Sequence, residues 1–320
     1  MSEPTRSRPP VPVSVSEEAQ AFLKIAPYPA RPKPALDDID GWVRRVEEVN
    51  RQIAARYART PCPVDTEASD IGGVTTYIAC APGVRNDNTT PIYIDFHGGG
   101  LMNGGGPLCG HLAGVKAMDT DMIMWAPDYR MPPHNPYPAA LDDCIAVYRA
   151  VLDRRSPKEI FVGGGSAGGN LAAALLVRAK DEGLPMPAGL LLLSPEVDLT
   201  ESGDTFNTLL GIDNVLTGSL AISIQLYANG YDLAHPYLSP LLADLRGFPD
   251  TFLQSGTRDL FLSNTVRMHR KLLAADVEAE LHIFEAMPHG GFGGGAPEDR
   301  EVRRAVRRFL DRHRRHPIVG

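Results

Sequence analysis

The chain has 320 residues, of which 43% are hydrophobic and 22% are charged, a composition typical of a soluble globular protein. Its formal net charge of -7 and the absence of a basic stripe argue against nucleic acid as a partner. The longest apolar run, residues 188–193, is far shorter than the roughly 20 residues of a membrane helix, and the N-terminus lacks the apolar core of an export signal, so we expect a cytoplasmic protein with no membrane partner.

Residues 1–60 are predicted to form an N-terminal tail and a helical cap that precede the main fold. Residues 1–13 are rich in proline and serine, a composition typical of disorder. Ser14 to Glu17 has the pattern of a capping box ahead of a short helix over 17–26. A longer amphipathic helix is predicted over 35–59. Its apolar face is expected to carry Ile39, Val43, Val46, Ile53 and Tyr57.

Residues 61–320 are predicted to form one domain of alternating strands and helices. Two strands are expected to pair across Gly72 and Gly73. Buried strands are then predicted over 91–96, 121–127, 159–164, 188–194, 250–256 and 278–284. Helices are predicted over 110–119, 138–155, 167–182, 217–228 and 263–275. This alternation indicates a mostly parallel central sheet with helices on both faces. The stretch 199–230 fits the alternation poorly and is predicted to be a cap insertion over the site.

The arginine-rich end of the chain, residues 298–316, is predicted to be an amphipathic helix with a solvated charged face. The spacing of the cysteines is not typical of metal ligands, and they are predicted to be reduced thiols. They are Cys62, Cys80, Cys109 and Cys144.

Five glycines surround Ser166 between a predicted strand and a predicted helix. A dinucleotide fingerprint is one explanation, because Gly163, Gly165 and Gly168 have its bare spacing, but this turn comes in mid-chain and lacks a well-placed acid. A Walker-type phosphate loop needs a lysine that is absent here. The third explanation is the G-x-S-x-G nucleophile elbow, in which small flanking residues let strand and helix approach around a strained serine.

A nucleophilic serine also needs hydrogen-bond donors for the oxyanion, and an upstream loop is predicted to supply them. His97 to Gly100 reads HGGG directly after a predicted strand, where backbone N–H groups can bind an oxyanion. The general base must follow the serine in the chain. Among the histidines downstream of Ser166, His235 reads as a loop residue, His282 as a strand residue, and His313 and His316 as solvated. His289 follows the last predicted strand and is the predicted base.

The acid is expected between the serine and the histidine. Asp259 stands at the carboxyl end of a predicted strand, where the active sites of open α/β sheets gather. Asp198 follows the strand after the elbow and is the alternative, although an anchoring role in its loop suits it better.

Together these motifs resemble the bacterial hormone-sensitive-lipase-like esterases of the α/β-hydrolase superfamily. The resemblance covers residues 91–313 and rests on six segments. They are HGGG (97–100), DYRMPP with NPYPAALDD (128–143), GGSAGGN (164–170), SP-x-x-DLT (194–200), GTRDLF (256–261) and PHGGF (288–292).

The resemblance implies an α/β-hydrolase fold with an N-terminal helical cap and a catalytic triad of Ser166, Asp259 and His289. It also implies an oxyanion hole made by the N–H groups of Gly99, Gly100 and Ala167, and it leaves open which two of the three HGGG glycines donate. This chain departs from the family pattern beside the site, at Gly165, Leu101 and Ser263. The expected pocket residues are Leu101, Met102 and Gly165.

The sequence therefore predicts a serine carboxylic-ester hydrolase acting on short- to medium-chain acyl esters. An amidase or lactonase with the same triad is the alternative, and a ligand-binding protein on a hydrolase scaffold is less favoured because all three triad residues are present. No metal and no organic cofactor is expected. The expected partner is a small-molecule ester, and a homodimer is left open.

Overall fold

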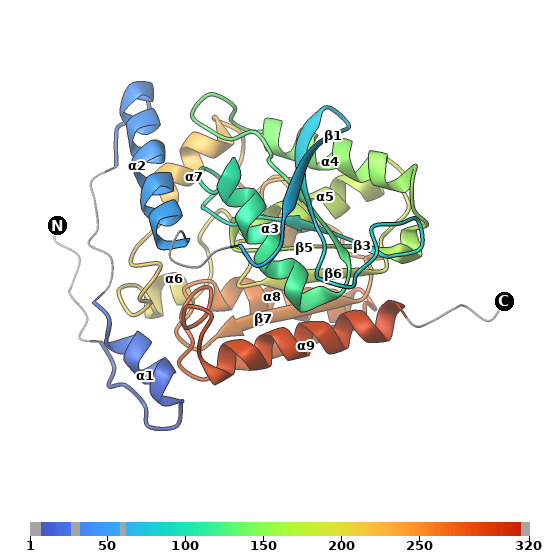
Figure 1. Cartoon of the computed structure of the whole chain (residues 1–320). Coiled ribbons are helices and arrows are strands. Elements are labelled where there is room, and N and C mark those ends of the chain that lie inside the picture. Colours follow the sequence, from blue (N-terminus) through green and yellow to red (C-terminus); the bar gives the residue numbers. More distant parts are fainter. Residues whose placement is uncertain (1–7, 27–32, 58–61, 315–320) are drawn as a thin grey trace.

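A central sheet organises the computed structural model, which describes residues 8–26, 33–57 and 62–314. In this part of the chain eight strands are ordered β1-β2-β4-β3-β5-β6-β7-β8 (Figure 1). β1 and β2 pair across Gly72 and Gly73, as predicted, and β2 is also antiparallel to β4. The other pairs are parallel. The strands are β1 (Thr66–Ile71), β2 (Val74–Ala79), β3 (Ile92–Phe96), β4 (Ile123–Pro127), β5 (Ile160–Gly165), β6 (Gly189–Leu193), β7 (Thr251–Gly256) and β8 (Ala279–Phe284).

Helices cover both faces of this sheet (Figure 1). One face is covered by α4 (Ala139–Leu152), α5 (Ala167–Asp181) and α8 (Leu262–Ala274). The other face is covered by α3 (Pro107–Thr120) and α9 (Pro297–Arg314). The insertion between β6 and β7 contains α6 (Thr205–Thr208) and α7 (Ala221–Ala228). The predicted alternation of strands and helices is confirmed.

Each of the strands β3 to β7 contributes to two separate cores, because successive side chains point to opposite faces of a sheet. In β3, Ile92 and Ile94 pack against α4 and α5, whereas Tyr93 packs on the side of α3. In β5, Ile160 and Val162 take the first side and Phe161 takes the second. Both faces are thus apolar, which explains why these strands appear as continuous apolar runs in the sequence.

The predicted C-terminal helix is confirmed, but the burial of β8 and of His313 in that helix differs from the prediction. β8 is only partly buried, because it is an edge strand with a neighbour on one side. His313 was predicted to be solvated, but its side chain is 17% exposed, packs on Phe309 and pairs with Asp250 at 2.9 Å. The apolar face of α9, including Phe309 and Leu310, holds this histidine against the sheet. His316 lies outside the described residues.

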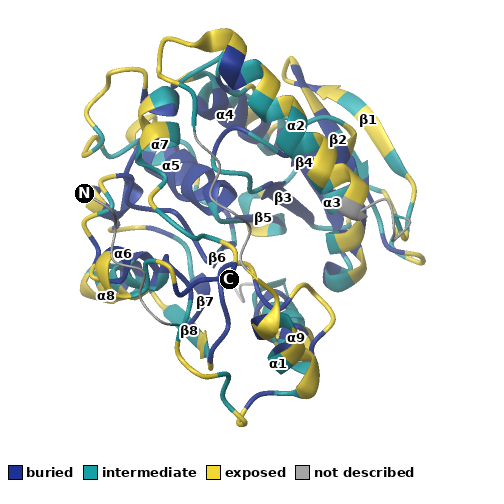
Figure 2. Cartoon of the chain, turned by 90° about the vertical axis from the view of Figure 1, so that its left-hand side faces the viewer, coloured by how far each residue is buried: buried dark blue, intermediate teal, exposed yellow. Residues whose placement is uncertain are grey.

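The N-terminal segment also differs from the prediction. Residues 8–13 were expected to be disordered, but Arg8 donates a hydrogen bond to Asn214, and Arg258 donates one to the Pro10 carbonyl. Residues 1–7 lie outside the described part. The N-cap of α1 (Glu17–Lys24) is Ser16 rather than Ser14, and Glu298 of α9 accepts hydrogen bonds from the backbone N–H and hydroxyl of Ser16. Figure 2 shows α1 and α9 side by side.

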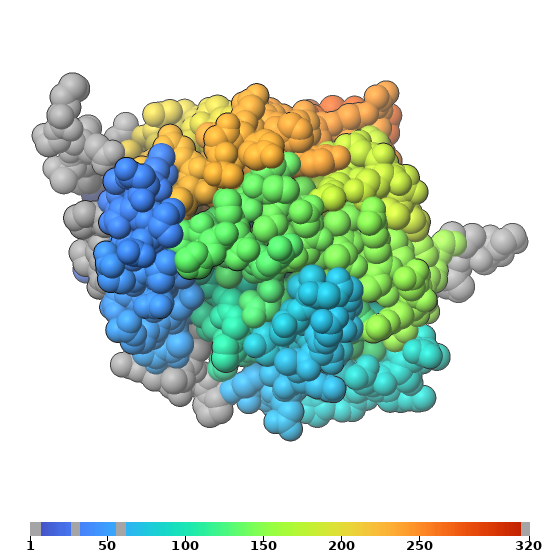
Figure 3. Space-filling view, turned by 90° about the horizontal axis from the view of Figure 1, so that it is seen from above, coloured from blue at the N-terminus to red at the C-terminus, as the bar shows by residue number. Residues whose placement is uncertain are grey.

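α2 (Ile39–Tyr57) packs beside α3 and forms one side of the molecule seen from above (Figure 3). Its buried anchor is Trp42, which the predicted apolar face did not include. Of that predicted face, Val43, Val46 and Ile53 are half-buried and Ile39 is exposed; the side chain of Tyr57 lies outside the described part. The two N-terminal helices therefore cover different parts of the molecule.

Candidate active site

The glycine cluster makes a sharp turn from β5 into α5. A Cβ on Gly164 would lie 2.4 Å from the carbonyl carbon of Gly168, and a Cβ on Gly168 would lie 1.9 Å from the Phe96 carbonyl oxygen. No side chain fits at either position. Ser166, between them, has φ 57° and ψ -125°, a conformation that is costly for a residue other than glycine. The turn thus presents a strained, partly exposed serine at the N-terminus of α5.

The HGGG segment lies against this turn. A Cβ on Gly98 would be 3.3 Å from the Ser166 Cβ. His97 is buried; its Nδ1 is 2.9 Å from the Gly98 carbonyl, and its ring stacks on Tyr129 with centroids 4.2 Å apart. The Tyr129 hydroxyl donates to the His97 carbonyl at 2.7 Å. Burial lowers the pKa of His97 to about 4, so this histidine is neutral and acts as a brace for the loop.

The predicted oxyanion donors have no acceptor in the part of the chain that the structure describes. Within residues 8–26, 33–57 and 62–314, the N–H groups of Gly99, Gly100 and Ala167 donate no hydrogen bond. Ala167 is the first residue of α5, where the N–H has no partner inside the helix and the helix dipole favours negative charge. These groups are the predicted oxyanion donors.

His289 and Asp259 form a buried hydrogen-bonded pair. The Nδ1 of His289 lies 3.0 Å from Oδ1 of Asp259, and both side chains are almost fully covered. Asp259 also accepts hydrogen bonds from the Ser255 hydroxyl at 2.6 Å and the Phe261 N–H at 2.9 Å. Phe261 packs edge-on against the imidazole. These contacts fix both the carboxylate and the ring.

The charges of this pair support each other. Burial raises the pKa of Asp259, but His289 and the hydroxyl and N–H donors outweigh it, and the net direction is downward. Burial lowers the pKa of His289, but Asp259, Asp213 and Glu196 outweigh it, and the net direction is upward. Asp259 is therefore ionised at neutral pH, its partner Nδ1 carries a proton, and Nε2 of the neutral ring is left as the acceptor.

Sheet topology places these residues at one edge. Ser166 follows β5, and the loops with Asp259 and His289 follow β7 and β8, three parallel strands of the same sheet. Their carboxyl ends therefore meet at the same edge. In the described part of the chain the imidazole of His289 bonds to Asp259, and no hydrogen bond joins it to Ser166 Oγ. Such contacts commonly tighten only when substrate binds.

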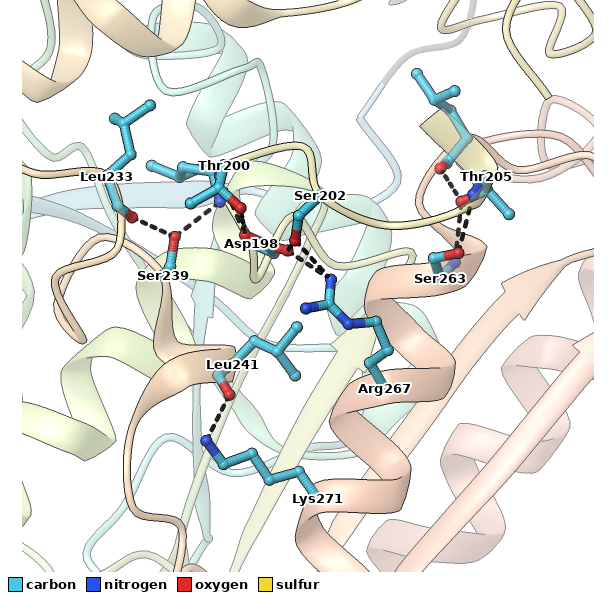
Figure 4. A network of polar contacts seen from close by, with 12 residues as sticks. Asp198, Thr200, Ser202, Thr205, Leu233, Ser239, Leu241, Ser263, Arg267 and Lys271 are labelled. Atoms are coloured by element: carbon cyan, nitrogen blue, oxygen red, sulfur yellow. Dashed lines mark hydrogen bonds and ion pairs between the residues drawn. The ribbon is translucent and has the colours of Figure 1, made fainter. Parts of the chain in front are cut away.

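The alternative bases lie in other settings. His235 accepts a hydrogen bond from the Tyr237 N–H in an exposed turn. His282, in β8, stacks on Phe252 of the neighbouring strand β7. Asp198, the alternative acid, accepts hydrogen bonds from Thr200, Ser202 and Arg267 (Figure 4). That network ties the start of the insertion to α8, and neither Asp259 nor His289 takes part in it.

The predicted pocket residues are more enclosed than a pocket mouth would be. Leu101 is 1% exposed and belongs to the core beneath the HGGG loop, and Met102 is 4% exposed. Gly165 is half-buried beside Ser166. The loop that follows is fixed from α2, because the Gly104 N–H donates to Oδ1 of Asn50 at 3.0 Å.

Two buried carboxyl groups near the site were not predicted from the sequence. Glu196 is 1% exposed, its N–H donates to the Ser166 carbonyl at 3.1 Å, and burial raises its pKa to about 8. Asp213 of the insertion accepts a hydrogen bond from the backbone N–H of His289 at 3.2 Å. Glu196 lies at an unspecified position of the motif SP-x-x-DLT, in which Asp198 is the named acid. Asp213 belongs to no recognisable motif. Spacing alone gave no signal for either.

Among the residues described, no cluster of three or more His, Cys, Asp or Glu side chains is arranged to hold a metal ion. The helices of that same part are all too short or too polar to cross a membrane. All four cysteines are free thiols in the structure.

Comparison with known proteins decides the family. Residues 93–292, more than half of the chain, match the family described as the alpha/beta hydrolase fold. The chain belongs to the α/β-hydrolase family. An acetyl-hydrolase of Streptomyces hygroscopicus is 31% identical to this hydrolase over 207 residues, which are 64% of this chain and 69% of that protein.

Two solved structures are also similar to this hydrolase. A crystal structure of an esterase E25 has a TM-score of 0.88 and 32% identity, and covers 98% of this chain and 99% of its own. The hormone-sensitive-lipase homologue EstE7, from a metagenome library, has a TM-score of 0.77 and 32% identity, and covers 88% of this chain and 100% of its own. The predicted fold and the predicted resemblance to hormone-sensitive-lipase-like esterases are thereby confirmed.

Proposed function

We propose that this hydrolase is a serine carboxylesterase that cleaves short- to medium-chain acyl esters with Ser166 as nucleophile, His289 as base and Asp259 as acid. The observation that carries the proposal is the buried His289–Asp259 pair, at the sheet edge where the strained Ser166 is presented. The esterase and acetyl-hydrolase names of its relatives support the same class of reaction.

The geometry supports a two-step acyl transfer. Nε2 of His289 takes the proton of Ser166 as Oγ attacks the ester carbonyl, and Asp259 holds the imidazole in the required tautomer and stabilises its cation. The imidazolium then gives its proton to the leaving alcohol. Water, activated by the same base, releases the acid from the acyl-enzyme. The free N–H groups of Gly99, Gly100 and Ala167 bind the oxyanion, and one such donor is worth about 10²–10³ in turnover.

A substrate panel tests the reaction class. We expect carboxylic esters to be hydrolysed faster than matched anilides, because an alcohol leaves from the tetrahedral intermediate more readily than an amine. They should also react faster than matched lactones, because the alcohol released from a lactone stays tethered to the acyl-enzyme and can close the ring again. The measurement is kcat/KM for esters, lactones and anilides that share one acyl group. Faster turnover of the anilide would assign an amidase, and faster turnover of the lactone would assign a lactonase.

The activity should rise with pH as His289 loses its proton. The net effect of the neighbouring carboxylates raises the pKa of His289 above its ordinary value of about 6.5, so the rising limb of kcat/KM should be centred above that pH. The check is kcat/KM for a p-nitrophenyl ester between pH 5 and 9, with substrate stability controlled. A flat profile over this range would contradict histidine as the base.

Acyl groups of two to about six carbons should be preferred. The loop after HGGG is held by Asn50 of α2, which supports a pocket closed at that end, and each buried methylene should add about 0.8 kcal/mol, roughly fourfold in kcat/KM, until the pocket ends. p-Nitrophenyl esters from two to sixteen carbons measure this preference. A preference for sixteen carbons would contradict a closed pocket.

The contribution of α2 to this preference can be tested separately. Asn50→Ala removes the acceptor of the Gly104 N–H and should loosen the loop after HGGG, raising KM for the six-carbon ester several-fold. Arg51→Ala, on the exposed side of the same helix, is the matched control and should leave KM unchanged. Equal KM values for the two variants would show that α2 only covers the surface. Removing residues 1–30 is less suitable, because it would also uncover Met287 and Phe292 beside His289.

A further inference from the structure

Asp213 is a fully buried carboxylate outside the predicted triad. It lies in the insertion between α6 and α7 and is 0% exposed. Its Oδ1 accepts hydrogen bonds from the N–H groups of Val215 at 2.8 Å and Leu216 at 3.2 Å. These two bonds fix the side chain within its own loop.

The second oxygen of Asp213 joins the two loops that carry the predicted acid and base. Oδ2 accepts from the Leu260 N–H at 3.0 Å and from the His289 N–H at 3.2 Å. Leu260 directly follows Asp259, so one oxygen holds the backbone at both members of the His289–Asp259 pair. The 3.0 Å contact between their side chains is thereby supported by a link between their backbones.

The hydrogen bonds also indicate the charge state of Asp213. An ionised carboxylate has about four acceptor sites, and four N–H groups point at this one. A protonated form would need an acceptor for its own hydrogen, and each surrounding group is a donor. Burial and the charge of Asp259 raise the pKa of Asp213, the charge of His289 and the N–H donors oppose that shift, and the net direction is upward. The carboxyl groups that face the imidazole are Asp259, Asp213 and Glu196, and Glu196, with its pKa raised to about 8, carries its charge only above neutral pH.

We propose that Asp213 is a positioning residue for the reaction, which sets the distance between the acid and base loops and adds a second negative charge beside the imidazolium. The inference rests on the proposed triad, because Asp213 acts only through Asp259 and His289. The insertion that was predicted to cover the site thus also contributes to its geometry. Asn214, the next residue, donates to the carbonyls of Phe22, Leu23 and Ile25, so the same loop also anchors the end of α1.

Asp213→Asn in the full-length chain tests the proposal. An amide keeps one acceptor oxygen and turns an NH₂ group toward two N–H donors, so one pair of bonds is lost. We expect kcat to fall about 10–100-fold with KM within about twofold, since a displaced base affects chemistry rather than binding. Loss of the negative charge should lower the pKa of His289 and move the rising limb of kcat/KM to lower pH by about half a unit to one unit.

Asp198→Asn is the matched control. Asp198 is as buried as Asp213 and also anchors the insertion, but its partners are Thr200, Ser202 and Arg267. This variant should lose stability without moving the pH limb. If Asp213→Asn lowered stability alone, with kcat and the pH limb unchanged as in Asp198→Asn, the proposal would be overturned. Failure of the triad itself would appear differently, as an active Ser166→Ala variant.

A measurement on the unmodified chain covers the case in which Asp213→Asn does not fold. Amide hydrogen exchange should show the N–H groups of Leu260 and His289 protected and exchanging at a common rate, because both depend on one oxygen atom. Unprotected amides at these two positions would overturn the proposal.

Discussion

Replacing Ser166 by alanine should lower turnover of a p-nitrophenyl ester by a factor on the order of 10⁶. The loss is large because no other group at the elbow can form the acyl-enzyme, and His289 then has no alcohol to deprotonate. Stability should be unchanged, because the strain at φ 57° is the same for alanine and Ser166 Oγ makes no hydrogen bond in the described part of the chain. Steady-state kinetics and thermal unfolding measure the two effects.

Ser194→Ala is the matched control for this experiment. Ser194 also has a positive φ, 46°, and stands at the end of the neighbouring strand β6. It is buried, and its N–H donates to the Gln254 carbonyl. This variant should keep activity within a few-fold of the unmodified chain. Full activity of Ser166→Ala, or equal losses in the two variants, would refute Ser166 as the nucleophile.

Asp259→Asn should lower turnover by about 10⁴ while the protein stays folded. An amide in place of the carboxylate no longer selects the tautomer with the proton on Nδ1, so Nε2 of His289 ceases to be a reliable acceptor. The amide has the shape of the carboxylate, which preserves the local packing, although an NH₂ group in place of Oδ1 gives up the hydrogen bond from the Phe261 N–H. The measurement is kcat together with the free energy of unfolding from denaturant titration.

The same change at Asp198 should have the opposite outcome. Asp198 is buried and pairs with Arg267 at 2.5 Å, so Asp198→Asn should cost about 1–3 kcal/mol of unfolding free energy with little loss of kcat. If Asp198→Asn abolished turnover and Asp259→Asn only reduced stability, Asp198 would be the acid. Both substitutions remove one negative charge from a buried aspartate, so their difference isolates contact with the imidazole.

Much of this protein is determined by local sequence. The apolar runs of β3 to β7 mark strands covered on both faces, and the glycines at 164 and 168 mark a place where backbones approach too closely for a side chain. His289 and Asp259 could be selected because each follows a strand, and parallel strands bring their carboxyl ends together. The spacing of apolar residues, the spacing of the glycines and the order of motifs along the chain can all be recognised without knowledge of the fold.

Other features depend on contacts between distant segments. The half-burial of β8 follows from its place at the sheet edge, and the ordered residues 8–13 follow from the contacts of Arg8 and Pro10 with loops more than two hundred residues away. No local pattern encodes either outcome. The same holds for His313, whose pairing with Asp250 depends on where α9 crosses the sheet.

The carboxylate of Asp213 shows most clearly which contacts cannot be predicted from local sequence. Its local sequence, Gly-Ile-Asp-Asn-Val, predicts no more than a turn, and a turn is what its Oδ1 forms. Its contacts with Leu260 and His289 span 47 and 76 residues and arise only once the insertion folds over the sheet edge. The proposed reacting groups could therefore be selected from the sequence. The charges and backbone links that surround them are decided by tertiary structure, because burial and long-range hydrogen bonds have no local signature.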